Sequence, residues 1–393
     1  MSLAMLEVRI THTARPGLCG TIRERKPLSD NRECRADLAD EVPAPDLPYL
    51  PRNPARYNPP IALIGCGGIA PYHLRAYKHT GYNVVALCDH TRAKAESLKN
   101  EFFPGASILS DFREAIGTTE IEVLDVATHP GQRVDIIAAG LRAGKHILSQ
   151  KPFVMDLDTG LRLAEIAESN GVRLAVNQNG RWAPHFAYIR AAIDAGLLGS
   201  ISGAQLAVQW DHNWTADTPF NALRHLILYD FAVHWFDILT CFMGDAEALS
   251  VFARVSRSAH QRANPPLLAE ISVAYPDALA SLSFHADTRF GAQDQTFVAG
   301  NLGTARSIGP DLNSQSVTIT TSAGRATPVL SGDWFTNGFH GAMAELLCAI
   351  EEGRRPYHDA RHNLRSLALC FAAIASADTG ESVVPGAIRS VHV

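Results

Sequence analysis

Between residue 58 and about residue 178, short apolar runs alternate with longer stretches that have one apolar face. The short runs predict buried strands, and the amphipathic stretches predict helices. We expect strands at 61–64, 84–88, 121–127, 146–149 and 172–176, and helices at 69–79, 91–102, 132–143 and 156–170. Strands and helices that alternate over short loops are typical of a parallel sheet covered by helices on both faces.

The pattern changes after residue 180. Helices are predicted at 184–195, 221–242, 335–352 and 360–377, and strands at 201–210, 249–255, 269–275, 278–285, 296–299 and 316–321. Runs of strands with few helices between them predict an α+β domain built on an open, mostly antiparallel sheet. Strands 249–255, 269–275 and 278–285 carry more apolar residues than one helix layer is expected to bury. We therefore expect an uncovered apolar face and a homodimer or homotetramer.

Residues 1–57 differ from both regions, because they contain seven prolines, many charges and no sustained periodicity. They form either a disordered tail or an extended arm that lies across another surface, which could belong to a neighbouring subunit. The predicted organisation is thus an extension over 1–57, a dinucleotide-binding domain over 58–180, and a substrate-binding and oligomerisation domain over 181–393.

Composition excludes several classes of protein. The net charge of −5 gives no reason to expect nucleic acid or an anionic membrane as a partner. No apolar run approaches the roughly 20 residues that span a bilayer, and the N-terminal residues lack the apolar segment of a signal peptide. The seven cysteines are scattered without C-x-x-C spacing, which is typical of reduced thiols in a cytoplasmic protein.

A glycine-rich turn directly follows the first predicted strand. The sequence Gly65-Cys66-Gly67-Gly68-Ile69-Ala70 has the G-x-G-x-x-A form that binds a dinucleotide pyrophosphate between a strand and a helix. The free N–H groups at the helix N-terminus attract phosphate. Asp89 ends the second strand, about 20 residues past the glycines, where the acid that binds the ribose hydroxyls is expected. The alternative is an ordinary turn between a strand and a helix.

Two further motifs carry reactive side chains. Lys151 and Pro152 follow the strand at 146–149, at the sheet edge where ligands of parallel sheets bind. An ammonium there could stabilise negative charge that develops on a substrate oxygen, although a solvated surface lysine has the same sequence. Asp230 and His234 are four residues apart and share one face of the helix predicted at 221–242. His234 could accept a hydroxyl proton, or the pair could be a structural contact in the core.

With these motifs in place, the chain resembles the family of glucose-fructose oxidoreductase, inositol dehydrogenase and MocA-like oxidoreductases, over residues 59 to about 380. The motifs that carry the resemblance are Gly65–Ala70, Asp89, Asp125-Val126-Ala127-Thr128, Gln150-Lys151-Pro152, Arg181-Trp182-Ala183-Pro184, and Asp230 with His234 and Asp237. The resemblance implies a Rossmann domain, a C-terminal domain with a large open sheet, and hydride transfer between NAD(P) and a sugar or cyclitol.

The resemblance also assigns roles to residues. It implies that Lys151 polarises the reacting oxygen, that His234 accepts the proton, and that Asp230 binds substrate or orients His234. Thr128, His129, Gln150 and Lys151 are expected beside the cofactor, together with the glycine turn (Gly65, Gly67, Gly68, Ile69 and Ala70) and Asp89. The chain departs from the family at Gln150, where Glu is usual, so a negative neighbour of the lysine is missing. Arg133 stands near a position where the family tends to have histidine.

The substrate pocket is expected to combine polar and aromatic residues, because sugars offer both hydroxyls and C–H faces. Arg181, Trp182, Trp210, His212 and Asn221 are the candidates at its rim, although any aromatic residue among them could instead pack an interface. No second ligand cluster accompanies Asp211 and His212, so no metal is expected. His358 and His362 are expected on the surface.

Cofactor and reaction class follow from the same residues. Asp89 favours NAD, because a carboxylate repels the 2′-phosphate of NADP, although Arg92 could weaken that preference. The leading interpretation is an NAD-dependent sugar or cyclitol dehydrogenase. A glycosidase that retains NAD and acts by transient oxidation, and a non-catalytic dinucleotide sensor, are the alternatives.

Overall fold

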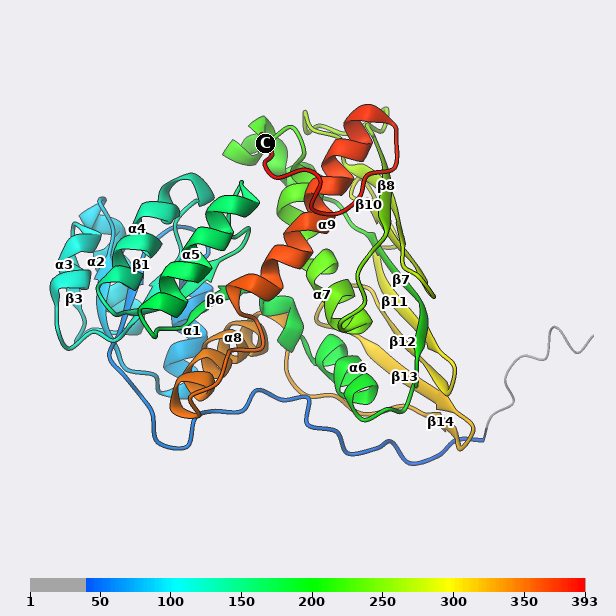
Figure 1. Cartoon of the computed structure of the whole chain (residues 1–393), viewed down its shortest axis with the longest axis horizontal. Coiled ribbons are helices and arrows are strands. Elements are labelled where there is room, and N and C mark those ends of the chain that lie inside the picture. The colour runs from blue at the N-terminus through cyan, green and yellow to red at the C-terminus, as the bar shows by residue number, and fades with distance from the viewer. Residues whose placement is uncertain (1–39, 393) are drawn as a thin grey trace, which may run out of the picture. The chain divides into compact units, whose positions relative to one another are not determined.

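The computed structural model describes residues 40–392, which contain two sheets and the helices packed on them (Figure 1). The first sheet has six parallel strands in the order β3-β2-β1-β4-β5-β6. Its strands are β1 (Ile61–Ile64), β2 (Val84–Cys88), β3 (Ser107–Leu109), β4 (Val123–Val126), β5 (His146–Gln150) and β6 (Leu174–Asn177). Its helices are α1 (Ala70–Thr80), α2 (Arg92–Phe102), α3 (Phe112–Gly117), α4 (Pro130–Arg142) and α5 (Leu157–Ser169). This order is that of a dinucleotide-binding fold, as predicted.

The second sheet has eight strands in the order β14-β13-β12-β11-β7-β10-β9-β8. They are β7 (Ile201–Gln209), β8 (Ser250–Ser256), β9 (Leu268–Ala274), β10 (Leu279–His285), β11 (Gln293–Gly300), β12 (Gly303–Gly309), β13 (Ser316–Thr321) and β14 (Gly324–Ala326). Only the β7–β10 pair is parallel, so the prediction of a mostly antiparallel sheet is confirmed.

Helices cover one face of this second sheet (Figure 1). They include α6 (Pro184–Asp194), α7 (Val233–Met243) and α9 (Ala360–Thr379), whereas α8 (Trp334–Glu351) packs on α1. The inward rows of the strands are apolar, but the outward rows carry side chains such as Arg254, Glu270, Ser272 and Ser283. The outer face is therefore more polar than predicted, because strict alternation places most apolar residues of these strands on the helix side, although Phe252 and Leu279 remain exposed on it.

The predicted helix over 221–242 is interrupted. A short 3₁₀ turn (Pro219–Ala222) is followed by a π turn (Ile227–Phe231), and regular α-helix begins only at Val233. The N–H of Ala232 bonds to the carbonyl of Ile227, five residues back, at 2.9 Å. Such single π turns widen a helix locally and are frequent at functional sites. The π turn was not predicted, because the apolar residues of this segment keep a continuous helical spacing through it.

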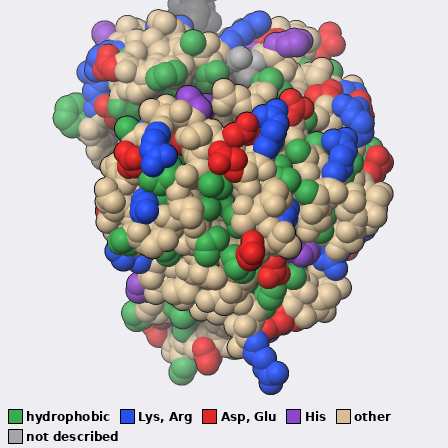
Figure 2. Space-filling model, turned by 90° about the vertical axis from the view of Figure 1, so that its left-hand side faces the viewer, with side chains coloured by type: hydrophobic (Ala, Val, Ile, Leu, Met, Phe, Trp, Pro, Cys, Tyr) green, Lys and Arg blue, Asp and Glu red, His purple; other side chains and the backbone are tan. Residues whose placement is uncertain are grey.

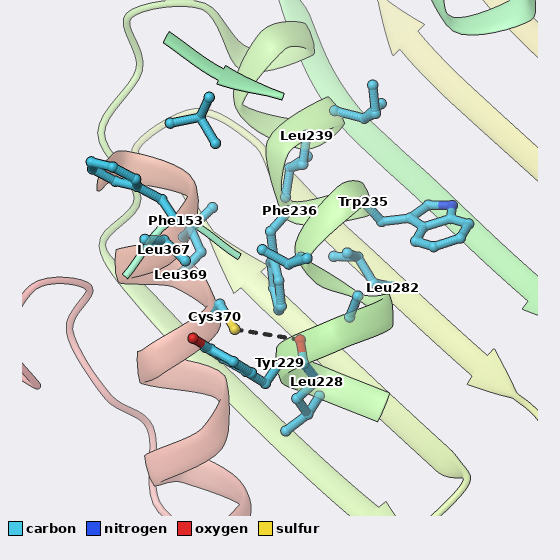
Figure 3. Close-up of a cluster of buried hydrophobic side chains, with 14 of the residues drawn as sticks. Phe153, Leu228, Tyr229, Trp235, Phe236, Leu239, Leu282, Leu367, Leu369 and Cys370 are labelled. Carbon is cyan, nitrogen blue, oxygen red and sulfur yellow. Dashed lines mark hydrogen bonds between the residues drawn. The ribbon is translucent and has the colours of Figure 1, made fainter. Parts of the chain in front are cut away.

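A buried apolar cluster contains side chains from both domains (Figure 3). Phe153, which lies just after β5, is fully buried and packs in the same cluster as Phe236 of α7 and Leu367 of α9. The hydroxyl of Tyr229 also donates to the carbonyl of Val154 at 3.3 Å. The segment that follows β5 is thus anchored in the core of the second domain.

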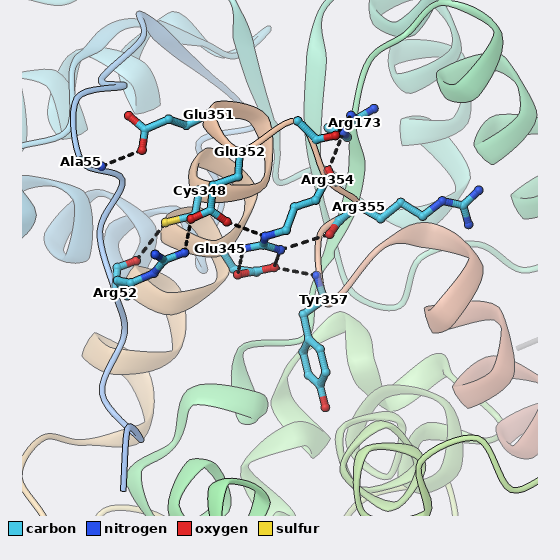
Figure 4. A network of polar contacts seen from close by, with 11 residues as sticks. Arg52, Ala55, Arg173, Glu345, Cys348, Glu351, Glu352, Arg354, Arg355 and Tyr357 are labelled. Carbon is cyan, nitrogen blue, oxygen red and sulfur yellow. Dashed lines mark hydrogen bonds and ion pairs between the residues drawn. The ribbon is translucent and has the colours of Figure 1, made fainter. Parts of the chain in front are cut away.

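Residues 40–57 form an arm that lies along this same chain, so for these residues the docked alternative holds (Figure 1). Near its start, the arm exchanges backbone hydrogen bonds with Arg325 of β14, from Val42 at 2.9 Å and to Asp40 at 2.8 Å. Near its end, the carboxylate of Glu351 accepts the N–H groups of Ala55, Arg56 and Tyr57 at 2.7–2.9 Å (Figure 4). The earlier part of the predicted extension lies outside the described residues.

The surface of the dinucleotide-binding domain carries basic and acidic side chains interspersed with one another (Figure 2). Within residues 40–392, no helix is both long enough and apolar enough to cross a bilayer. The described cysteines (Cys66, Cys88, Cys241, Cys348 and Cys370) are all buried free thiols.

Asp294 of β11 is an exception to the apolar inner face of the second sheet. It is fully buried, and neither carboxylate oxygen has a hydrogen-bond partner within the described chain. Burial, with a smaller contribution from Asp311, raises the pKa of Asp294 to about 7. A carboxylate without a partner destabilises the fold whenever it is ionised.

At pH values above 7, we expect Asp294→Asn to raise Tm by about 2–4 °C for each kcal/mol by which it increases the free energy of unfolding. In the unfolded chain the group ionises near 3.8, and in the folded chain near 7, so wild-type stability should fall as the pH rises between these values. The asparagine variant should lose this dependence, as thermal melts across that range will show. Asp277→Asn, which neutralises an exposed carboxylate, is the matched control. A lower Tm for Asp294→Asn would mean that the carboxylate has a stabilising partner.

Candidate active site

The glycine turn between β1 and α1 has the shape that a dinucleotide requires. Gly65 has φ +100°, and a Cβ there would meet the backbone of Ala127 and Thr128 at 3.0 Å, so only glycine fits. Gly67 and Gly68 are exposed and have open space where a Cβ would project. No side chain caps the N-terminus of α1, and the open backbone at Gly67 and Gly68 just before it leaves room for a pyrophosphate at the positive end of the helix.

Asp89 follows β2 and lies beside this turn. One carboxylate oxygen accepts the N–H of Cys66 at 2.8 Å, and the other accepts the N–H of Thr91 at 2.8 Å. Just past the end of β4, the hydroxyl of Thr128 is buried and has no partner among residues 40–392. The open backbone at Gly67, the positioned carboxylate and the unpartnered hydroxyl together fit a bound dinucleotide.

Lys151 and Asp230 meet between the two domains. The ammonium of Lys151 donates to the backbone carbonyl of Asp230 at 2.9 Å and to its carboxylate at 3.2 Å. Both side chains are 17% exposed, so the pair is accessible from solvent. The side chain of Gln150 does not face this ammonium; its oxygen instead accepts the N–H of Lys151 at 2.6 Å. Asp230 therefore supplies a negative partner for Lys151 despite the glutamine at position 150.

His234 is the second residue of α7, one turn beyond Asp230. Burial, and secondly the positive charge of Lys151, lower the pKa of His234 well below 6.5, so the imidazole is neutral at neutral pH. Its Nδ1 is buried, and no described residue is its hydrogen-bond partner. The rings of Trp235 and Trp334 lie 6.3 and 5.8 Å from the His234 ring.

Trp210 and His212 extend this aromatic group. The two rings stack with centroids 5.4 Å apart, and His212 lies 4.2 Å from Phe231, the neighbour of Asp230. Burial lowers the pKa of His212 to about 4, against the opposing effect of Asp211 and Asp230. Trp210 Nε1 and His212 Nδ1 are both buried and have no partner within the described chain.

The other predicted rim residues lie elsewhere. Arg181 is 1% exposed and pairs with both carboxylate oxygens of Asp237 at 2.6 Å, so it is a core residue. Trp182 is also buried and packs edge-on against His358. The side-chain oxygen of Asn221 accepts the N–H of Asn264 at 2.7 Å and holds a loop. Placement of Arg181 at the rim failed because arginine is usually exposed, and the pairing with Asp237 spans 56 residues.

The surface prediction for His358 is wrong as well. His358 is fully buried, and His362 is partly buried with its Nδ1 2.9 Å from the guanidinium of Arg181. Both residues lie next to the buried Arg181, which the sequence pattern did not reveal.

Arg133 is a functional candidate whose placement the sequence did not indicate. Its guanidinium is buried and donates to the carbonyls of Thr128, Gln150 and Pro152, which end β4 and β5. Burial lowers the pKa of Arg133 to about 9. A buried arginine bonded to three carbonyls fixes the two strand ends that surround Lys151. His129 occupies the N-cap position of α4 at the same edge, makes no capping hydrogen bond through its side chain, and is exposed.

A surface hollow of about 370 Å³ lies away from these groups, between α5, α9 and the chain's last residues. Its arginines already have partners, since Arg361 pairs with Glu168, Arg389 with Asp158, and Arg365 with the carbonyls of Gly244 and Ala246. The chemistry-bearing residues therefore lie at the Lys151–Asp230 contact and not in this hollow.

Comparisons with known proteins agree with this geometry. Residues 60–178 match the oxidoreductase family with an NAD-binding Rossmann fold, and residues 186–306 match the GFO/IDH/MocA C-terminal domain. The chain is 25% identical to D-apiose dehydrogenase of Paraburkholderia graminis over 82% of its length and 88% of the relative's. It is also 25% identical to inositol 2-dehydrogenase of Paracoccus denitrificans, over 75% of its length and 86% of the relative's.

Solved structures have the same fold at lower identity. An oxidoreductase from Agrobacterium radiobacter in complex with NAD+, L-tartaric acid and magnesium has a TM-score of 0.75 at 20% identity, covering 84% of this chain and 99% of that one. Levoglucosan dehydrogenase in complex with NADH and levoglucosan has a TM-score of 0.72 at 18% identity, covering 84% and 100%. With both of its domains matched in sequence and its strand order and glycine turn in agreement, the chain belongs to the Gfo/Idh/MocA family of NAD-binding oxidoreductases.

Proposed function

We propose that this protein is an NAD-dependent dehydrogenase that oxidises a hydroxyl-bearing carbon of a sugar or cyclitol. The observation that carries the proposal is the contact of Lys151 with Asp230 beside a neutral, partly buried His234. A cation that can polarise an oxygen thus lies next to a base that can accept its proton. NAD, when bound at the glycine turn, supplies the hydride acceptor.

The roles of the residues follow from their chemistry. Lys151 exchanges one of its hydrogen bonds to Asp230 for the substrate oxygen, and its charge stabilises the oxyanion that develops there. His234 takes the hydroxyl proton, since its low pKa keeps the imidazole unprotonated. Asp230 holds Lys151 and can accept a second substrate hydroxyl. Arg133 holds the strand ends that position Lys151.

The substrate class rests on the aromatic residues around His234 and on the relatives. Trp210, His212, Trp235 and Trp334 form a connected group of aromatic rings, and within the described chain Nε1 of Trp210 and Trp235 and Nδ1 of His212 have no partner. Such a surface suits a polyol, which presents C–H faces and hydroxyls. The relatives are named for D-apiose and inositol, and one of the similar structures holds levoglucosan.

A dehydrogenase screen tests the proposal. Purified protein with NAD is offered myo-inositol, D-apiose and levoglucosan, and NADH formation is followed. Net NADH on a free polyol supports the dehydrogenase. Release of an aglycone from a glycoside without net NADH would support the NAD-retaining glycosidase instead, and dinucleotide binding without turnover of any polyol would favour a sensor.

We expect His234→Ala to lower kcat by roughly 10²–10⁴-fold, the usual contribution of a general base, with little change in the Kd of NADH. Lys151→Ala should lower kcat by a similar factor and should also weaken NADH binding. Because the wild-type imidazole is neutral well below pH 6.5, loss of activity through its protonation should also occur only well below that pH. His79→Ala, on the exposed face of α1, is the control. Near wild-type turnover by His234→Ala would reassign His234 to the core.

For the cofactor, we expect wild-type protein to bind NAD more tightly than NADP, with Asp89 as the cause. Asp89→Asn keeps the shape but removes the charge, so the preference for NAD should shrink by about 10- to 100-fold, measured as the ratio of the two Kd values. Glu101→Gln, at the exposed end of α2, should leave the ratio unchanged. Tighter binding of NADP by the wild-type protein would contradict the assignment.

We also propose that the open face of the second sheet pairs with a second copy of the chain. Among the described residues, helices cover only the inner face of this sheet (Figure 1). On the open face, Phe252, Leu279 and Phe297 remain 37%, 66% and 38% exposed. Light scattering at micromolar protein should give a dimer or a tetramer, and Phe297→Arg should reduce the mass. Val329→Arg, at a residue exposed in a loop, is the control. A monomeric wild-type protein would refute the proposal.

A further inference from the structure

A fully buried hydrogen-bonded chain lies beneath the segment that carries Lys151. His73 and Tyr77 of α1 and Asp125 of β4 are 0% exposed. One oxygen of Asp125 accepts the hydroxyl of Tyr77 at 2.6 Å and lies 2.7 Å from Nδ1 of His73. The other nitrogen of His73, Nε2, lies 2.9 Å from the amide nitrogen of Gln150.

The chain ends on the backbone of Lys151. The side-chain oxygen of Gln150 accepts the N–H of Lys151 at 2.6 Å. An N–H group can only donate, so Gln150 must present its oxygen to Lys151 and its NH₂ group to His73. Nε2 of His73 must therefore be an unprotonated acceptor.

At the other end of the chain, the carboxylate of Asp125 requires that Nδ1 of His73 be protonated. An ionised Asp125 can only accept, so Nδ1 of His73 carries the proton, and the imidazole is neutral in a single tautomer. Tyr77 remains a donor, because burial raises its pKa well above 10. The ring of Phe339 packs on His73 at 4.4 Å from the remaining side. Only one assignment of protons fits these four contacts, whereas the second carboxylate oxygen of Asp125 is buried and has no partner within the described chain.

We propose that Asp125 and His73 are positioning residues for Lys151, acting through the amide of Gln150. The carboxylate sets the tautomer of His73, the tautomer sets the orientation of the Gln150 amide, and the amide holds the N–H of Lys151. Arg133 holds the carbonyls of Gln150 and Pro152, so the lysine segment is fixed on both of its polar sides. Lys151 thereby reaches Asp230 and the reacting oxygen in one geometry. The inference rests on the proposed function only for the role of Lys151.

The proposal predicts a new pH dependence in Gln150→Glu. Glutamate can still accept the N–H of Lys151, but it now offers only acceptors to His73, which must carry protons on both nitrogens to bridge two carboxylates. The bridge is complete at low pH and is lost as the pH rises and the imidazolium loses its proton. We therefore expect kcat and Tm of Gln150→Glu to fall on the alkaline side, with kcat about 10–100-fold below wild type there.

Adding Asp125→Asn to Gln150→Glu should remove the fall in kcat and Tm at alkaline pH. In the double variant, the only carboxylate is at position 150. A neutral His73 can then donate from Nε2 to this carboxylate and accept at Nδ1 from the asparagine amide. The hydrogen bonds of His73 thus run in the opposite direction to those in the wild type. The double variant Gln150→Glu, Asp125→Asn should recover about 10-fold in alkaline kcat, as expected for directly coupled residues. Asn100→Asp, which adds the same charge at an exposed position of α2, should behave as wild type.

The measurements are kcat across pH on the polyol that the screen identifies, and Tm across pH without substrate. NADH binding confirms that each variant is folded. Alkaline losses in Gln150→Glu that the second substitution reverses support the proposal. Profiles of Gln150→Glu that match wild type, or a double variant that does not recover, would overturn it. If no polyol in the screen is oxidised, the dehydrogenase proposal fails, whereas the Tm profiles still decide whether the chain of hydrogen bonds exists.

Discussion

The contact between Lys151 and Asp230 joins the segment that follows β5 to the π turn that precedes α7, two elements far apart in sequence. Its geometry depends on apolar burial nearby, because Phe153 is enclosed by side chains of the second domain and Tyr229 bonds to the carbonyl of Val154. These neighbours hold the ends of the two segments before any ligand binds. A core substitution at Phe153 would therefore act on the chemistry as well as on stability.

Charge around this contact is distributed unequally. Asp230 is the anion beside Lys151, and its charge also reaches the buried guanidinium of Arg133, which bonds only to carbonyls. A neutral His234 completes the group. Two cations and one anion produce a net positive field where an oxyanion would develop, and burial strengthens that field.

The elements that the sequence predicted were those with strong periodicity or a fixed motif. Strands β1, β2 and β5, the glycine turn and Asp89 lie where they were expected, because burial on both faces and the backbone demands of the turn leave a local pattern. The π turn and the pairing of Arg181 were not predictable, since both depend on tertiary contacts. Asp125 did leave a usable signal, because a charged residue within an otherwise apolar strand requires a buried partner.

Both edge strands of the eight-stranded sheet pair with another segment of the same chain. At β14, the arm pairs through Glu41 and then continues into a proline-rich stretch that cannot extend a ladder. At β8, Val251 exchanges both backbone hydrogen bonds with Val383 from the C-terminal segment. Each edge thus ends in a short, terminated strand from the same chain. The sheet is protected against growth by strand addition, so copies of this protein can meet face to face without the risk of open-ended fibrous assembly.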